Sequence, residues 1–479
     1  MKTDVLIIGG GVTGVAVARE LSKYDAETTL VEREVDVGWG QSKASYALRH
    51  PGVQWPPGSL AQQMIAHGNQ LMDQLIEDLD IEFKRSGELV LAFNREEVKA
   101  LETMQRRGNG INVQGISIMG KNDISRLEPN ASEAAIAALY MPTAGVFNPF
   151  DLLHGFCENA RDNGVNMLMG ARVEGISPER SGFRVKTSRG EIRTAYIVNA
   201  AGLFAAKVAA MAGIDEFEIS SETKGSCLVI DSLLAHKVRH IVTGLIDPGA
   251  LLRFKLATPT FHGKILLYTA MAVPSKGIED RSVDKVIFDS TIRAARGLIP
   301  GVDFEKHIIA AFAGLTARNN RGDFIIEPSG KYNRFIHAAL PPPGLTASPA
   351  VGRRVVEVLK SNGLALREKT GFNPRRRRIE SLRDSTPARI EELVKHDPRY
   401  GRVVCRCEKV SEAEVIEAIR RGATTIDGVK FRTRASMGRC QGNYCGPELA
   451  RILANQTEQS FQDITRRGGN SHYANPVHD

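Results

Sequence analysis

Residues 4–14 read Asp-Val-Leu-Ile-Ile-Gly-Gly-Gly-Val-Thr-Gly, and this stretch decides the fold of the first part of the chain. The apolar, β-branched run of residues 4–8 predicts a short buried strand. The glycines that follow predict a tight turn, and residues 15–21 have the composition of a helix. Residues 28–32 form a second apolar run and predict the next strand. A strand, a turn, a helix and a strand in this order predict a parallel sheet with a right-handed crossover.

The spacing Gly9-x-Gly11-x-x-Gly14 adds a chemical expectation to this fold. The first glycine permits the turn, the second lets a pyrophosphate approach the backbone, and the third lets helix and strand pack closely. The N-terminus of the helix stabilises the phosphate charge. Glu32 follows Gly14 by 18 positions, at the end of the second strand, and is placed to accept hydrogen bonds from ribose hydroxyls. We therefore expect a dinucleotide site that includes Glu32 and its neighbour Arg33.

Two stretches of small residues favour FAD over NAD. Residues 38–45 directly follow the ribose-binding strand and contain Ser42 and Ala44, which can approach the pyrophosphate and the flavin side of an extended FAD. Residues 197–205 form a strand that runs into small residues, and Ala201 and Gly202 there allow close backbone approach to the cofactor. Because only one convincing glycine fingerprint is present, a direct NAD(P)H role is disfavoured.

Cysteines gather near the C-terminus. Four of the six form one C-x-C pair and one C-x4-C pair, about thirty residues apart. They are Cys405 and Cys407, then Cys440 and Cys445. Four thiolates can hold one zinc ion or one small iron–sulfur cluster, and disulfides are a third alternative. The isolated Cys157 and Cys227 are expected to be small buried hydrophobes.

The first part of the chain resembles the FAD-dependent oxidoreductases of the D-amino-acid oxidase superfamily, above all the glycerol-3-phosphate dehydrogenase and 2-hydroxyglutarate oxidase branch. Residues 42–52 resemble the flavin-facing loop of that family, residues 138–145 its return into the FAD domain, and residues 344–350 its last flavin contact. The resemblance implies further cofactor contacts at Val173, beside the adenine, and at Gly344, Leu345 and Thr346, where a helix N-terminus faces the flavin carbonyls.

Residues 400–455 resemble the BFD-like (bacterioferritin-associated ferredoxin) 2Fe–2S domain. Residues 432–442 are similar to the version that is fused to anaerobic glycerol-3-phosphate dehydrogenases. This resemblance implies a 2Fe–2S cluster on the four clustered cysteines, in place of zinc.

The expected fold is therefore α/β, with a Rossmann-like FAD-binding domain interleaved with an α+β substrate domain and followed by a small α-rich 2Fe–2S domain. The oxidoreductase body is expected at residues 1–365. Within it, the FAD-binding parts are residues 1–80, 141–220 and 311–365, and the substrate domain is formed by residues 81–140 and 221–310. A basic linker at 366–399, the 2Fe–2S domain at 400–455 and a tail at 456–479 complete the chain.

The resemblance also implies how the chemistry is divided. FAD takes a hydride from a carbon that bears a hydroxyl or amine group. His50, in the flavin-facing loop, is the candidate base, because an imidazole titrates near neutral pH. Arg318 and Lys224 are candidates for binding the substrate anion. The family carries its arginine where this chain has Thr316, a departure that leaves the exact substrate open, and Arg318 or Arg321 could replace that arginine.

The leading hypothesis is a dehydrogenase of a small anionic alcohol, either sn-glycerol 3-phosphate or a 2-hydroxy acid. Electrons would pass from FAD through the 2Fe–2S cluster to a partner subunit or a quinone-linked chain. An amine or imino-acid dehydrogenase that acts on proline, hydroxyproline or an opine is one alternative. An electron-transfer subunit with catalysis elsewhere is another, suggested by the departures at Thr316 and Pro341. A peroxide-forming oxidase is disfavoured, because a fused one-electron centre offers a route other than oxygen.

The net charge of +8 is first of all typical of a basic soluble protein, and the alternative is attraction to anionic substrates, acidic partner subunits or anionic lipid headgroups. Nucleic acid is not expected, since aromatic residues make up only 6% and do not interleave with the basic ones. No apolar stretch reaches the length of a membrane span, so membrane association is expected only through partners. Paired thiols without a visible secretory signal favour the cytoplasm, including the inner face of the membrane.

Overall fold

The computed structural model describes residues 1–246, 252–272 and 276–474, which divide into two units. The first unit contains residues 1–33 and 38–375, and the second contains residues 34–37 and 376–479. This division falls inside the segment predicted to be a linker, and residues 475–479 of the predicted tail lie outside the described residues. Among the described helices, none is both long and apolar enough to cross a bilayer.

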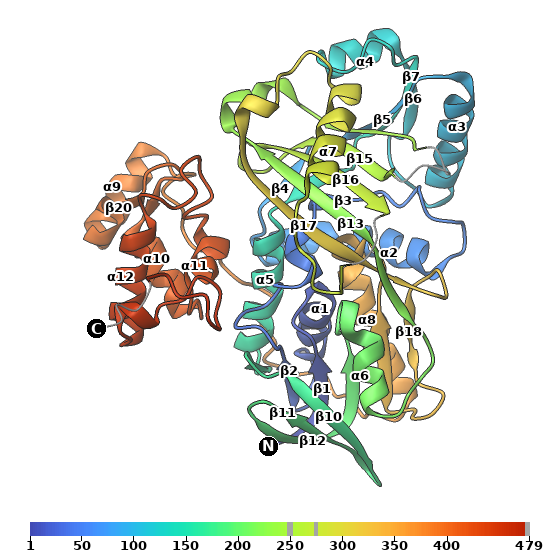
Figure 1. Ribbon diagram of the computed structural model, residues 1–479. Coiled ribbons are helices and arrows are strands. Elements are labelled where there is room, and N and C mark those ends of the chain that lie inside the picture. The colour runs from blue at the N-terminus through green and yellow to red at the C-terminus, as the bar shows by residue number, and fades with distance from the viewer. Residues whose placement is uncertain (247–251, 273–275, 475–479) are drawn as a thin grey trace. The chain divides into compact units, whose positions relative to one another are not determined.

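A mostly parallel sheet forms the nucleotide-binding part of the first unit (Figure 1). Its parallel strands are, in spatial order, β19 (Phe335–Ala339), β12 (Gly190–Asn199), β1 (Lys2–Ile8), β2 (Thr28–Val31) and β9 (Asn166–Leu168). The antiparallel hairpin of β10 (Val173–Glu179) and β11 (Gly182–Thr187) pairs with the first half of β12, and β18 (Ile325–Pro328) pairs with β19. Ile7 lies opposite both Val198 and Leu30, and all three side chains are buried, which is why these strands read as continuous apolar runs.

Four long helices pack beside this sheet. Helix α1 (Val12–Leu21) contacts α5 (Pro149–Asp162) and α8 (Gly344–Ser361), and α8 also contacts α2 (Leu60–Asp78). A Cβ atom at Gly352 would lie 2.8 Å from the carbonyl oxygen of Ala16, so α1 and α8 can only approach this closely because residue 352 is glycine. Ser59 begins α2 by accepting a hydrogen bond from the backbone N–H of Gln62. The short α6 (Ala205–Met211) follows β12.

A second eight-stranded sheet contains most of the strands of the predicted substrate domain. Its strands are, in order, β17 (Ile308–Asn319), β13 (Ile219–Ile230), β16 (Ile265–Ala272), β15 (Leu252–Pro259), β14 (Ile241–Gly244), β5 (Glu88–Ala92), β7 (Ala137–Met141) and β6 (Ser117–Gly120). Only β14 and β5 are parallel neighbours in the described sheet. Helix α7 (Lys285–Leu298) covers one face, where Leu228 and Ile230 pack against Ile292. Helices α3 (Arg95–Gly110) and α4 (Lys121–Leu127) lie at the β5–β7–β6 end, and a three-stranded sheet joins β3 (Leu48–Arg49), β8 (Gly145–Phe147) and β4 (Phe83–Arg85).

The second unit is small and mainly helical. It contains α9 (Pro387–His396), α10 (Glu412–Arg420), α11 (Ile426–Thr433), α12 (Gly446–Thr457) and the short strands β20 (Val403–Cys405) and β21 (Val410–Ser411). Its core includes Val415, Val429 and Leu453, all without solvent exposure. Residues 34–37 belong to it because Asp36 forms a buried, two-bond ion pair with Arg432. The predicted α/β class with an interleaved body and a small C-terminal helical domain is confirmed.

Candidate active site and cysteine cluster

The glycine turn between β1 and α1 is built from close backbone contacts. Gly9 has φ +110°, and a Cβ atom there would lie 2.5 Å from the carbonyl oxygen of Ala200. A Cβ atom at Gly14 would overlap the carbonyl oxygen of Gly9. Both positions therefore need glycine for the turn to exist, as the sequence pattern predicts.

Glu32 and Ser42 reach the same turn from later segments. A carboxylate oxygen of Glu32 accepts the backbone N–H of Gly10 at 2.6 Å. The hydroxyl of Ser42 accepts the N–H of Val12, the first residue of α1, at 3.0 Å, and a Cβ atom at Gly11 would lie 3.3 Å from that hydroxyl. The predicted phosphate-binding and ribose-binding residues thus meet at a helix N-terminus, which favours negative charge.

The predicted contacts that follow β12 lie beside Arg33. The Arg33 guanidinium lies 4.2 Å from the centre of the Phe204 ring and forms an ion pair with Glu279 at 2.9 Å. Gly202 has φ +56°, and a Cβ atom there would lie 2.8 Å from Gln41, in the same loop as Ser42. Val173 begins β10 and is buried.

The N-terminus of α8 lies next to that of α1. A Cβ atom at Gly344 would lie 3.5 Å from a methyl group of Val12, and no side chain caps the first turn of α8. Thr346 accepts the backbone N–H of His50 at 3.0 Å and donates to the carbonyl oxygen of Leu48 at 3.2 Å. The predicted flavin contacts at 344–346 and the predicted base are therefore brought together, although they are about 300 positions apart.

His50 sits in a buried aromatic cluster. Its Nε2 atom lies 3.2 Å from the hydroxyl of Tyr46, while Nδ1 has no hydrogen-bond partner among the described residues. The Tyr46 ring contacts those of Phe254 and Tyr268, with centroids 5.4 and 4.4 Å apart. Sequence reasoning missed Tyr46, and the only signal was its position four residues before His50.

Burial controls the charges in this cluster. It lowers the pKa of His50 to about 4, so the imidazole is neutral at pH 7. It raises the pKa of Tyr46, and the nearby Glu88 carboxyl raises that pKa further. Burial also raises the pKa of Glu88 to about 7, although Thr243 donates a hydrogen bond to this carboxyl at 3.1 Å. Glu88 is a titratable group of this site that no motif indicated.

The two candidate anion-binding residues lie on opposite faces of the substrate sheet. Along β17, side chains alternate between faces, so Arg318 shares a face with Thr316 and Gly314, and Gly314 packs directly against Ala44. The shift by two residues from the family position therefore keeps the arginine on the same face. Lys224 shares its face with Leu228, under α7, and its ammonium group binds Asp280 at 2.7 Å and Ser282 at 3.1 Å. The structure thus does not bring Lys224 and His50 together.

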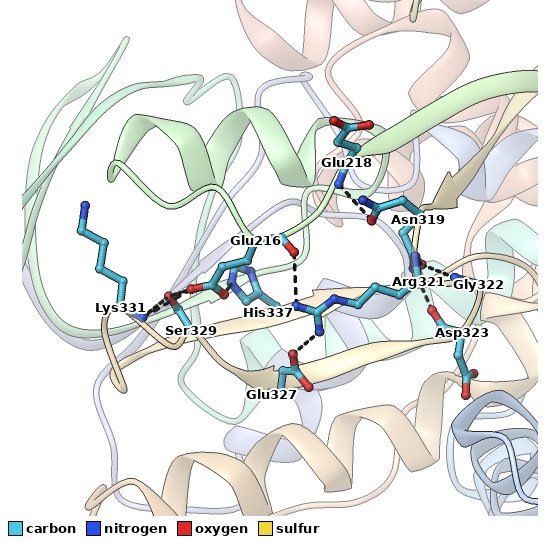
Figure 2. Close-up of polar contacts among 11 residues, drawn as sticks. Glu216, Glu218, Asn319, Arg321, Gly322, Asp323, Glu327, Ser329, Lys331 and His337 are labelled. Carbon is cyan, nitrogen blue, oxygen red and sulfur yellow. Dashed lines mark hydrogen bonds and ion pairs between the residues drawn. The ribbon is translucent and has the colours of Figure 1, made fainter.

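The alternative arginine, Arg321, belongs to a polar network at the end of β17 (Figure 2). Its guanidinium forms an ion pair with Glu327 of β18 and donates to the carbonyl oxygen of Glu216 at 3.2 Å. The Glu216 carboxylate in turn accepts from Ser329 at 2.7 Å and lies 3.2 Å from the buried His337 ring. Arg321 is therefore held by a protein carboxylate, whereas Arg318 forms no ion pair with any described residue.

In the second unit, the four clustered cysteines converge as two pairs. The sulfur atoms of Cys407 and Cys440 are 3.7 Å apart, and Cys405 lies close enough to Cys445 to lower the pKa of that thiol to about 6. A tetrahedral metal with metal–sulfur distances of about 2.3 Å separates its sulfur ligands by about 3.8 Å. Cys405 and Cys445 are buried, Cys440 is half-buried and Cys407 is exposed.

Backbone N–H groups lie beside these sulfur atoms. The backbone of Tyr444, with that of Gly442, lowers the pKa of the Cys440 thiol. Positive φ angles at Lys409, Ser436, Gln441 and Gly442 turn the chain around the site. Such concave arrays of N–H groups bind anions, including iron–sulfur clusters. The residues present therefore fit a thiolate-ligated cluster.

Comparison with known proteins separates the alternatives. The family described as FAD dependent oxidoreductase matches residues 4–358, and the BFD-like [2Fe-2S] binding domain matches residues 403–455. A glycerol 3-phosphate dehydrogenase of Caloramator mitchellensis is 36% identical, covering 97% of this chain and 96% of that protein. The mitochondrial L-2-hydroxyglutarate dehydrogenase of Bos taurus is 27% identical, with coverage of 55% and 60%.

Among solved structures, the FAD-bound L-α-glycerophosphate oxidase of Mycoplasma pneumoniae superposes with a TM-score of 0.73 at 25% identity, covering 78% of this chain and 98% of that one. The L-proline dehydrogenase of P. horikoshii has a TM-score of 0.68 at 24% identity, which shows the shared fold. The predicted cofactors, FAD and a 2Fe–2S cluster, are confirmed by the family and domain matches. The chain belongs to the FAD dependent oxidoreductase family, is an enzyme similar to glycerol-3-phosphate dehydrogenase, and carries a C-terminal BFD-like 2Fe–2S domain.

Proposed function

We propose that the protein oxidises sn-glycerol 3-phosphate at its secondary alcohol carbon to the ketone, and that electrons leave through the 2Fe–2S cluster. The observation that carries this proposal is the 36% identity to a glycerol 3-phosphate dehydrogenase over nearly the whole length of both chains, cluster domain included. A 2-hydroxy acid is the second candidate substrate, since an L-2-hydroxyglutarate dehydrogenase matches about half of the chain. The amine and imino-acid alternative has support only at the level of fold.

FAD, when bound, supplies the acceptor for the hydride that leaves the substrate carbon. The proposed task of His50 is to take the proton of the substrate hydroxyl as that hydride leaves. The neutral imidazole is in the right state, and Nδ1 has no protein partner among the described residues. For Nδ1 to accept a proton, Nε2 must carry the ring hydrogen and donate to the Tyr46 oxygen. Tyr46 would then fix the tautomer of the base.

Arg318 is the proposed partner of the substrate phosphate. Its face of β17 is the face that packs on the Ala44 loop, and its guanidinium is exposed and free of ion pairs with described residues. A guanidinium binds a phosphate through two parallel hydrogen bonds. For Lys224, a substrate-binding role stays a prediction, because Asp280 would first have to release its ammonium group.

The proposed electron route ends at an acceptor partner. Cys407 is the exposed ligand of the proposed cluster, and the neighbouring Arg406, Lys409, Arg439 and Tyr444 are also exposed, Tyr444 to 82%. Positive charge around an exposed redox centre attracts an acidic partner and speeds its encounter. A protein acceptor or a quinone-linked chain would take the electrons one at a time.

The test is an anaerobic substrate screen on the FAD-loaded and cluster-loaded protein. We expect sn-glycerol 3-phosphate to bleach the flavin absorbance within seconds, and the paramagnetic signal of a reduced cluster to follow. L-2-hydroxyglutarate, L-proline and glycine serve as comparison substrates. Bleaching by L-proline alone would replace the proposed substrate class, and oxygen consumption that does not need the cluster would contradict the electron route.

A further inference from the structure

The hydroxyl of Ser436 contacts the cysteine cluster directly. It lies 3.3 Å from the sulfur atom of Cys445, and Ser436 is only 7% exposed. A cysteine that ligates iron has lost its proton, so in the loaded protein the serine hydroxyl must be the donor of this hydrogen bond. Gly442 leaves room for it, since a Cβ atom at 442 would lie 3.1 Å from the serine oxygen.

The contact lies on the buried side of the cluster. Cys405 and Cys445 are its two buried members, whereas Cys440 is half-buried and Cys407 is exposed. The Ser436 hydroxyl therefore acts on a sulfur atom that is shielded from water, where a hydrogen bond is electrostatically stronger.

The backbone conformation of Ser436 supports a task for its side chain. Ser436 has φ +72°, a left-handed conformation that glycine adopts freely and that strains other residues. Glycine at this position would relieve the strain, and it would lose the hydroxyl contact with Cys445. A strained non-glycine residue held at a site points to a task for its side chain.

We propose that Ser436 is a positioning residue that raises the reduction potential of the 2Fe–2S cluster through its hydroxyl hydrogen bond to Cys445. Reduction adds negative charge to the cluster and its thiolates, and a hydrogen-bond donor stabilises the reduced form more than the oxidised form. A higher potential makes the cluster a better acceptor of electrons from the flavin. The inference rests on the proposed ligation by the four cysteines and is independent of the substrate.

The experiment is a dye-mediated redox titration of the full-length holoprotein with dithionite, followed by the paramagnetic signal of the reduced cluster. Ser436→Ala and Ser436→Gly both lack the hydroxyl, but only the glycine variant relaxes the backbone. We expect the equilibrium constant for cluster reduction to fall about tenfold in both, which corresponds to about 59 mV for one electron. Ser385→Ala is the control, because that hydroxyl donates only to the backbone of Ser381 in the same unit.

Three outcomes overturn the inference. The first is an unchanged potential in Ser436→Ala with the cluster retained. The second is a change in Ser436→Ala that Ser436→Gly lacks, because the backbone would then be responsible. The third is loss of the cluster from both variants but not from Ser385→Ala, because the hydroxyl would then serve assembly. Failure of the proposed ligation is distinguished by a wild-type protein that gives no 2Fe–2S signal, and failure of the proposed substrate does not affect the titration.

Discussion

The Nε2 atom of His50 lies 3.2 Å from the Tyr46 hydroxyl, and Thr346 holds the backbone N–H of the same histidine at 3.0 Å. The ring of His50 is thus held by a neighbour in its own loop, and its backbone is held by the first turn of α8. This arrangement leaves Nδ1 as the one ring nitrogen without a partner among the described residues.

Replacing His50 by glutamine is expected to slow substrate-driven flavin bleaching by about 10²- to 10⁴-fold, the usual contribution of a general base. Tyr46→Phe removes the oxygen that accepts the Nε2 hydrogen. We expect the rate of flavin bleaching to fall about tenfold, because a tenfold change corresponds to the free energy of about one hydrogen bond. Stopped-flow absorbance under anaerobic conditions measures both rates. FAD content should stay at the wild-type level, and a His50→Gln variant with the wild-type rate would remove the base assignment.

Arg318→Gln is expected to raise the KM for sn-glycerol 3-phosphate by tenfold or more with a smaller effect on kcat. The reason is that a hydrogen bond to a charged group contributes about 1.5–3 kcal/mol. Arg321→Gln is the matched control, since Arg321 is already paired with Glu327 (Figure 2). Steady-state kinetics with an artificial acceptor compares the two variants. Equal effects at both positions would mean that neither arginine is the specific phosphate partner.

Gly14→Ala is expected to abolish FAD retention, because the added Cβ atom would overlap the carbonyl oxygen of Gly9 in the phosphate-binding turn. Gly297→Ala, in α7 and outside the predicted FAD contacts, is the matched control, since no atom lies within 4 Å of a Cβ atom there. The ratio of flavin to protein absorbance after gel filtration reports both. A Gly14→Ala protein that purifies yellow would contradict the assignment of this turn.

Cys405→Ser is expected to lose most of its iron and acid-labile sulfide, because a buried ligand of the cluster is removed. FAD should remain bound, since the predicted FAD contacts belong to the first unit. Cys157→Ser, which changes a partly buried cysteine of the first unit, is the control. Iron and sulfide assays on anaerobically purified protein measure the cluster content of both variants. Zinc without sulfide in the wild-type protein would contradict the presence of a 2Fe–2S cluster.

Glu88 makes stability depend on pH. Burial raises the pKa of Glu88 from 4.5 to about 7 in the folded protein. The contribution of this carboxyl to the free energy of unfolding is therefore fully present below pH 4.5 and is lost as the pH rises through 7. Glu88→Gln stays uncharged at every pH. We expect equal stability near pH 4.5 and a gain for the variant of up to about 3 kcal/mol at pH 8.5.

Urea unfolding of the FAD-loaded protein at both pH values measures this difference for Glu88→Gln. Glu102→Gln, on the exposed face of α3, is the control and should give no gain at either pH. A gain for Glu88→Gln that is larger at pH 4.5 than at pH 8.5 would contradict the raised pKa of Glu88.

Features that depend on neighbouring residues could be predicted from the sequence. The turn at Gly9 and the close packing at Gly14 are backbone requirements that only glycine meets, so the pattern itself identifies them. The C-x-C and C-x4-C spacings likewise keep the two thiols of each pair near each other, whatever the tertiary structure around them. The interleaved α/β body and the helical cluster domain followed from these patterns and from the family resemblance.

Contacts between distant residues were decided only by the tertiary structure. The faces of β17 and β13 separate Arg318 from Lys224, and no local pattern states which face meets the Ala44 loop. Thr346 reaches His50 across almost 300 positions, and Arg432 reaches Asp36 across almost 400. The physical reason is that backbone conformation is encoded by adjacent residues, whereas burial, charge pairing and the pKa values that result depend on which surfaces pack together.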